Sequence, residues 1–167
     1  MSTLLEKQIK VNRIVTTSIE HARAIEDPAR AKIVEMLYRQ ALSADQITNV
    51  LKKVGYKKAL TTVRHHLEIL KNSGLIEIAK IEESRGAIKK YYGTSTKLLD
   101  FKTPKDFDSK YSKIIDKTST KIEKIIKGLT PKTTKSKGKK SKEYSQYLVV
   151  EIMNRAMTNV LENSEKK

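Results

Sequence analysis

The feature that most constrains the fold is a change of hydrophobic period at Gly74. Before this glycine, Val63, Leu67 and Leu70 recur at helical spacing, and a glycine in this place is typical of the end of a helix. After it, the first isoleucines of LIEIAKIEES alternate with other residues, which is typical of a strand with one buried face. We therefore predict a helix over residues 61–73 that is followed directly by a β-strand.

A second strand is expected to complete a hairpin. Arg85 and Gly86 supply the turn, and the segment AIKKYYGTS that follows is rich in residues that favour strands. Because two strands alone are only marginally stable in water, we expect this hairpin to pack against helices.

Three further helices are predicted before this unit. Apolar residues recur at helical spacing over residues 4–25. A second helix begins at Asp27 and Pro28, because Asp is a favourable N-cap and Pro lacks only an N–H that the first turn leaves unused. Ser43 and Gln46 have the spacing of a capping box, which predicts the start of a third helix. The expected buried residues of the third helix are Ile47, Val50, Leu51 and Val54.

Two long helices joined by a linker are predicted in the C-terminal part. The first covers residues 104–129, because Thr103 and Pro104 repeat the cap-then-proline pattern. Residues 130–142 are rich in lysine and have nothing to bury, so we predict either a plain linker or an auxiliary DNA tether there. The last helix is predicted over residues 143–163.

The first of these long helices carries a heptad seam. Its apolar positions are spaced alternately four and three residues apart, which is the spacing of helices that pair with one another. We expect this seam and a stripe on the last helix to form a dimer, with packing inside one chain as the alternative. Residues 1–17 are a further candidate for dimerisation. The predicted dimerisation residues are Tyr111, Ile115, Ile122, Ile125, Leu129, Val149, Met153 and Val160.

The charge of the chain favours a polyanionic partner. It has 35 Lys and Arg against 19 Asp and Glu, a formal net charge of +16, which points to nucleic acid first and an anionic membrane surface second. No apolar run reaches the roughly 18–20 residues that span a bilayer, and charges interrupt the N-terminal apolar stretch, so we expect no membrane segment and no signal peptide. A cytoplasmic, nucleoid-associated protein is the expectation.

Several classes of site are not expected. The absence of cysteine excludes disulfides, zinc fingers, iron–sulfur clusters and thiol catalysis. His65 and His66 are adjacent on a predicted helix and point about 100° apart, which makes a shared metal difficult. The chain has no nucleotide-binding glycine loop, HExxH motif or nucleophile elbow, so we expect neither an enzyme nor a bound cofactor or metal.

The order of the predicted elements indicates a winged helix-turn-helix domain over residues 18–96, in a fold that is mainly α with a small β-hairpin. In such a domain the third helix braces the fourth, which is narrow enough to enter the major groove. There Arg64 is suited to pair with guanine, and Thr61 or Thr62 to hold a phosphate at the helix N-terminus. The predicted DNA-binding residues are Lys57, Lys58, Thr61, Thr62, Arg64, His65, Arg85, Lys89 and Lys90.

Residues 18–95 resemble the ArsR-type winged helix regulators of bacteria and archaea. The resemblance rests on DPARAKIVEML, SADQI, TVRHHLEILKNSGLIE and a hairpin ending in two tyrosines. It implies a homodimeric transcription factor that binds a palindromic operator in double-stranded DNA and often represses. It also implies that His66, which matches a recurrent histidine of the family, is partly buried.

Two departures from the family pattern bear on function. The segment VGYKKALT between the third and fourth helices is longer than the 3–4-residue turn of the motif, which gives Lys57 and Lys58 a chance to reach phosphates. The absence of cysteine excludes the thiolate metal sensor that many members carry.

Three functions remain open on the sequence. The first is a sequence-specific DNA-binding regulator that acts as a homodimer. The second is a sequence-nonspecific architectural or chromatin-like protein, in which lysines supply most of the binding. The third is a winged-helix module that binds another protein.

Overall fold

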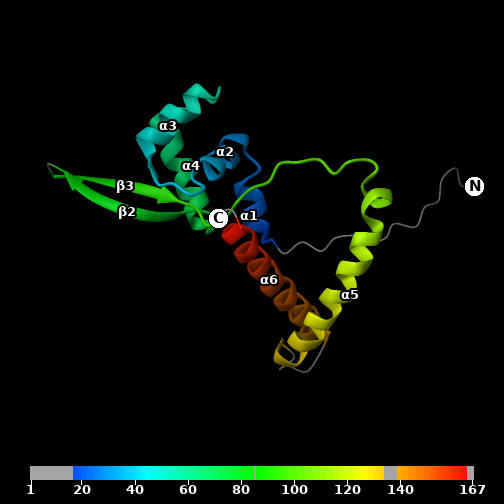
Figure 1. Ribbon diagram of the computed structural model, residues 1–167. Coiled ribbons are helices and arrows are strands. Elements are labelled where there is room, and N and C mark those ends of the chain that lie inside the picture. Colours follow the sequence, from blue (N-terminus) through cyan, green and yellow to red (C-terminus); the bar gives the residue numbers. More distant parts are fainter. Residues whose placement is uncertain (1–16, 85, 134–138, 165–167) are drawn as a thin grey trace, which may run out of the picture. The chain divides into compact units, whose positions relative to one another are not determined.

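The computed structural model describes residues 17–84, 86–133 and 139–164 (Figure 1). The described residues form two compact units, one over residues 17–101 and one over the described residues that follow. The predicted helix over residues 4–25 is wrong at residues 17 and 18, which are not helical: a helix begins at Ile19, where the side chain of Ser18 accepts a hydrogen bond from the backbone N–H of His21. Nearly all of the candidate dimerisation segment of residues 1–17 lies outside the described residues, and so does Arg85.

The first unit combines helices with a small antiparallel sheet, and the sheet order is β1-β3-β2. Figure 1 shows the hairpin β2–β3 projecting from the helices. The fold is therefore mainly helical with a small sheet, as predicted. The elements of this unit are α1 (Ile19–Ala24), α2 (Pro28–Met36), β1 (Leu42–Ser43), α3 (Ala44–Lys53), α4 (Leu60–Asn72), β2 (Glu77–Ser84) and β3 (Ala87–Gly93).

The corner between α1 and α2 is held by one short motif. The carboxylate of Asp27 accepts hydrogen bonds from the backbone N–H groups of Ala29 at 2.8 Å and Arg30 at 3.2 Å, which confirms the predicted N-cap of α2. The guanidinium of Arg30 donates in turn to the backbone oxygens of Ala24 and Arg23 at the end of α1. Asp27 and Arg30 thus satisfy polar groups at the start of one helix and the end of the other.

The predicted capping box is present at the start of α3. The backbone N–H of Ser43 donates to Oε1 of Gln46 at 2.9 Å, and the backbone N–H of Gln46 donates to Oγ of Ser43 at 3.4 Å. Ile47 and Leu51 are fully buried, as predicted. Val54 was predicted to be buried as well, and this is wrong, because α3 ends one residue earlier and Val54 is 46% exposed.

The strand β1 was not predicted from the sequence. Leu42 pairs with Tyr92 and Ser43 pairs with Tyr91, so the segment before α3 adds a third strand beside β3. A strand of two residues carries no hydrophobic alternation that sequence reasoning can recognise. The pairing attaches the hairpin to the start of α3.

One apolar core joins the four helices to the base of the hairpin. Within it, Val63, Leu67 and Leu70 of α4 are 1% exposed or less, as the helical spacing predicted. Gly74 follows α4 with a φ of 78°, a left-handed conformation that favours glycine and ends the helix. The core residues are Ala24, Ile33, Val34, Leu37, Ile47, Leu51, Val63, Leu67, Leu70, Leu75 and Ile76.

The second unit is built from α5 (Phe107–Thr133) and α6 (Lys139–Ser164), which pack against each other. The predicted start of the first long helix at residue 104 is wrong, because the backbone N–H of Phe107 is the first to bond back, to the oxygen of Pro104 at 3.2 Å. The predicted linker is also too long. Residues 130–133 belong to α5, and residues 139–142, three of which are lysines with a good helix propensity, belong to α6.

The predicted dimerisation residues do not share one environment. Val149 is buried at 8% exposure, and Ser145 one turn before it on α6 is buried as well. Four others are half-buried, namely Tyr111, Ile122, Leu129 and Met153. The remaining three are exposed, namely Ile115, Ile125 and Val160. The structure thus covers one part of the seam within a single chain and leaves another part uncovered.

Candidate nucleic-acid interface

The helix α4 has two sharply different sides. Its inner side carries the apolar core residues and the buried His66. At about 100° per residue, its exposed polar residues fall within an arc of roughly 100° opposite that side. We call this arc the outer face of α4, and it consists of Thr61, Arg64, His65, Glu68 and Asn72.

The N-terminus of α4 is open. Ala59 occupies the N-cap position and offers no side-chain acceptor to the first turn. Lys57, which is exposed, and Lys58, which is half-buried, come directly before it. Backbone N–H groups at an uncapped helix start, together with nearby ammonium groups, favour an anion such as a phosphate.

The long loop before α4 is anchored to the rest of the domain. Its Tyr56 packs against the apolar core, and the backbone N–H of Tyr56 donates to the oxygen of Leu51 at 2.8 Å. Gly55 has a φ of 95°, which lets the chain turn sharply after α3. The extra residues therefore form a defined turn that carries Lys57 and Lys58 to the start of α4.

The two lysines predicted on the hairpin lie on opposite faces of β3. Side chains alternate along a strand, so Lys90 shares a face with Ile88 and Tyr92, whereas Lys89 shares a face with Tyr91. The amine of Lys89 lies 5.6 Å from the centre of the Tyr91 ring, and the amine of Lys80 lies 5.5 Å from it. The sequence prediction treated the two lysines alike, and the structure separates them.

A pocket of about 300 Å³ lies between α4, the start of α3 and the hairpin. It is lined by residues 43–45 of β1 and α3, by Arg64 and Glu68 of α4, and by residues 88–90 and Tyr92 of β3. Of the predicted DNA-binding residues, the pocket brings together Arg64 and the two lysines of β3. The others that the structure describes do not line it and lie toward the N-terminal part of α4, namely Lys57, Lys58, Thr61, Thr62 and His65.

Glu68 is a candidate site residue that the sequence prediction left out. It lies on the outer face one turn after Arg64, and its Oε1 is 3.0 Å from Nζ of Lys71. The signal that was available is the four-residue spacing from Arg64, which places both side chains on the same side of a helix. A carboxylate in this place accepts hydrogen bonds from amino groups and repels phosphates.

His66 is buried at 6% exposure, as the family resemblance implied, and within the described part of the chain neither ring nitrogen has a hydrogen-bond partner. Burial lowers the pKa of His66 below its ordinary value, because the charged imidazolium loses water. The carboxylate of Asp27 opposes this shift, whereas Arg30, Lys58 and His65 add to it. A neutral His66 therefore packs behind the outer face and has no direct access to a ligand there.

The arrangement of α2, α3 and α4, with the hairpin attached beside α3, decides the fold of the first unit. This unit is a winged helix-turn-helix domain. In this class of domain the second helix of the motif is the one that enters the major groove, and here that helix is α4. The hairpin β2–β3 is the wing.

One comparison with known protein families agrees with this fold. A family model described as a helix-turn-helix domain matches residues 25–79, which run from the end of α1 into β2. Among solved structures, HlyU from Vibrio cholerae N16961 is 19% identical, with 47% of this chain and 74% of that chain covered and a TM-score of 0.37. A similarity at this level carries no argument about function. No curated protein sequence matches the chain.

The described residues hold neither a metal cluster nor a membrane-spanning helix. No group of three or more His, Asp or Glu side chains in residues 17–84, 86–133 and 139–164 is arranged to hold a metal ion. None of the helices described there combines the length and the apolar character needed to cross a bilayer.

Proposed function

We propose that the protein is a sequence-specific regulator of transcription that binds double-stranded DNA as a homodimer, of the ArsR-like kind that its sequence resembles. The observation that carries the proposal is the outer face of α4, where Arg64 and Glu68 lie one turn apart beside the wing. We infer that DNA binding through this face involves base edges as well as phosphates.

Arg64 and Glu68 have complementary preferences for bases. An arginine pairs with the O6 and N7 atoms of guanine, and a glutamate accepts a hydrogen bond from the N4 amino group of cytosine. One carboxylate oxygen of Glu68 is paired with Lys71 at 3.0 Å, and the carboxylate favours a base that donates to it over a phosphate, which would repel it. This favours sequence-specific reading over an architectural protein that binds through lysines alone.

The groups around the outer face are suited to hold the phosphate backbone. The open N-terminus of α4 offers backbone N–H groups, the hydroxyls of Thr61 and Thr62, and the amines of Lys57 and Lys58. From the wing, Lys89 and Lys90 both line the pocket with Arg64, and Lys90 shares its face of β3 with Ile88 and Tyr92, which line the pocket as well. These contacts set the position of α4 on the duplex without reading sequence themselves.

A second copy of the chain is the proposed partner for the uncovered apolar residues of α6. Met157, Val160 and Leu161 are 57%, 65% and 59% exposed, and they follow the part of α6 that carries the buried Val149. A palindromic operator needs two recognition helices about 34 Å apart, which a homodimer supplies. Burial of these side chains between two copies also removes apolar surface from water.

The test is a selection of bound sequences from random duplexes at about 150 mM salt, with Arg64→Ala and Glu68→Ala as variants. We expect a palindrome for the natural chain. Arg64→Ala should weaken binding by about 1–3 kcal/mol and relax the preference at one base pair. The matched control is Arg155→Ala, since Arg155 is an exposed arginine of α6 that pairs with Glu151 at 3.0 Å.

Each contrary outcome points to a different function. An unenriched pool with tight, salt-sensitive binding would overturn sequence reading in favour of the architectural function. A lack of binding to any duplex at low salt would leave the winged helix as a protein-interaction module. An enriched sequence without two-fold symmetry would contradict the homodimer.

A further inference from the structure

One side of α5 carries a row of exposed lysines. At about 100° per residue, the row occupies roughly 80° of the helix circumference, and at 1.5 Å per residue it extends about 21 Å along the axis. We call these residues the α5 lysine row, and they are Lys110, Lys113, Lys117, Lys121 and Lys124.

The acidic residues of α5 lie outside this row. Asp108, Asp116 and Glu123 are each about 100° or more from the centre of the row around the helix. Glu123 pairs with Lys127 at 2.7 Å, and Lys127 is not part of the row. In the part of the chain that the structure describes, no amine of the row has a carboxylate partner. The positive charge of the row is thus not neutralised locally.

Most of the row is also separate from the surface that α5 uses to pack, and only the amine of Lys110 lies near it, 5.5 Å from the centre of the Tyr111 ring. The half-buried Tyr111, Ile122 and Leu129 lie about 120° around the helix from the centre of the row. On α6, by contrast, Arg155 is paired with Glu151 and no comparable row occurs among its described residues. The row is therefore a local feature of α5, and packing of α5 against α6 leaves it accessible.

We propose that the α5 lysine row binds the phosphate backbone of double-stranded DNA as a second, sequence-independent contact of the same chain. The proposal rests on the proposed function for the choice of DNA as the polyanion. Lysine amines act as point charges toward phosphates and do not require a particular base. Duplex DNA carries one charge per about 1.7 Å, so a length equal to the row presents about twelve phosphates.

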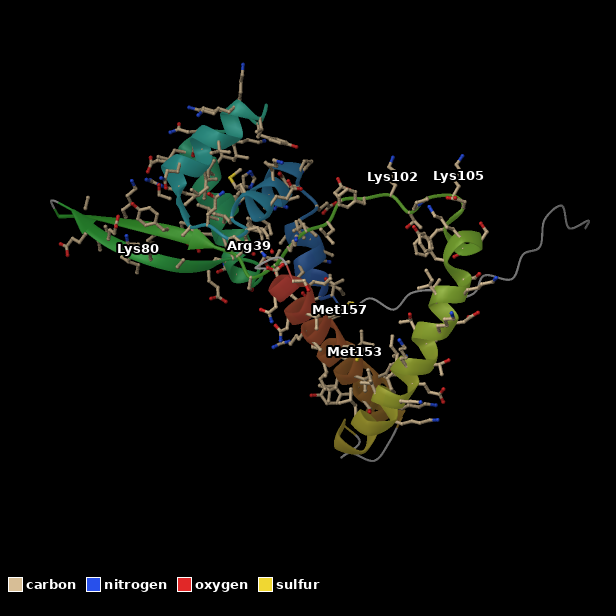
Figure 2. All side chains as sticks on the ribbon, viewed as in Figure 1. Arg39, Lys80, Lys102, Lys105, Met153 and Met157 are labelled. Carbon is tan, nitrogen blue, oxygen red and sulfur yellow. The ribbon has the colours of Figure 1, made fainter. Side chains whose placement is uncertain are left out.

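The test compares two triple variants of the full chain that remove equal charge. Lys113, Lys117 and Lys121 change to Gln in the row variant. Lys102, Lys105 and Lys127 change to Gln in the control; Figure 2 shows Lys102 and Lys105 ahead of α5. Glutamine and lysine have similar helix propensities, so both variants should keep their helices, which circular dichroism verifies.

The measured quantity is the dependence of DNA affinity on salt. Each phosphate contact contributes about 0.9 to the slope of log K against log salt concentration. For the row variant we expect the slope to lose about 2–3 in magnitude, and for the control we expect it to change by less than about 1. The loss should be the same on operator and on unrelated duplexes.

The outcomes separate this proposal from the function proposed for α4. If the natural chain prefers one sequence but the row variant keeps its slope, the row proposal is wrong and the proposed function stands. If the natural chain prefers no sequence but the row variant still loses slope, the proposed function is wrong and the row proposal stands. Equal losses of slope in the row variant and the control would overturn the row as a DNA contact. So would a row variant that keeps the slope of the natural chain on DNA but no longer binds vesicles of anionic lipid.

Discussion

The two amphipathic helices α4 and α5 differ in how fully their apolar residues are buried within one chain. In α4 the apolar residues of the inner side are 1% exposed or less, so a single chain covers them fully. In α5 the apolar residues Tyr111, Ile122 and Leu129 are only half-buried, and Ile115 is 44% exposed. The winged domain is complete within one chain, whereas the unit of α5 and α6 leaves apolar surface that a second copy can cover.

The largest expected effect is on the core of the winged domain. Leu67→Ala removes a buried side chain and should lower the free energy of unfolding by about 2–5 kcal/mol. Ile115→Ala on α5 should cost less, about 1 kcal/mol in dilute solution, because nearly half of this residue is already exposed to water. Urea denaturation of both variants measures the difference, and similar losses would break the contrast between the two helices.

A charge placed on the uncovered part of α6 should affect assembly. Val160→Glu is expected to raise the dissociation constant of the homodimer at least tenfold, about 1.4 kcal/mol, because a carboxylate would be buried between two copies. Sedimentation equilibrium measures this constant. Asn159→Glu changes a neighbouring exposed residue by the same charge and serves as the control. Dimers of equal strength in both variants would place the interface elsewhere.

The two lysines of the wing should differ in their effect on DNA binding. Lys90→Ala removes an amine from the face that borders the pocket with Arg64, so the slope of log K against log salt should fall by about 1. Lys89 also lines the pocket, but its amine lies 5.6 Å from the centre of the Tyr91 ring on the other face of β3, so for Lys89→Ala we expect a smaller change than for Lys90→Ala. Fluorescence anisotropy over a salt series distinguishes the two, and equal changes would show that the wing contacts DNA through both faces.

The smallest expected effect is the pH dependence that His66 adds to stability. Its pKa is lower in the folded chain than its ordinary value of 6.5, so the unfolded chain binds more protons at this residue. The stability that depends on neutral His66 is therefore present above pH 6.5 and is lost as the pH falls through the folded pKa.

His66→Gln removes this titration and should flatten the unfolding free energy between about pH 7 and pH 5 relative to the natural chain. Asp27 does not interfere, because its pKa is lowered from 3.8 despite its burial, chiefly by the hydrogen bonds from the Arg30 and Ala29 N–H groups. Its contribution is therefore lost only at more acidic pH. If the unfolding free energies of the natural chain and the His66→Gln variant change in parallel with pH, His66 is not the source of the pH dependence.

The predictions that the structure confirmed depend on interactions within about one helical turn. The N-cap at Asp27, the capping box of Ser43 and Gln46, and the helix end at Gly74 are each encoded by neighbouring residues. The predicted end of the first long helix at residue 129 was wrong, although its signals, Gly128 and Pro131, are local as well: α5 continues to Thr133.

The sequence alone therefore determined the starts of α2 and α3, the end of α4 and the buried side of α4, because period and caps act locally. Only the tertiary structure decided that Leu42 and Ser43 pair with β3, that Arg64, Glu68 and Lys90 border one pocket, and which apolar residues of α5 and α6 stay uncovered. These features join segments that are distant along the chain. Their formation depends on how the packed helices bring the segments together, and no local pattern encodes it.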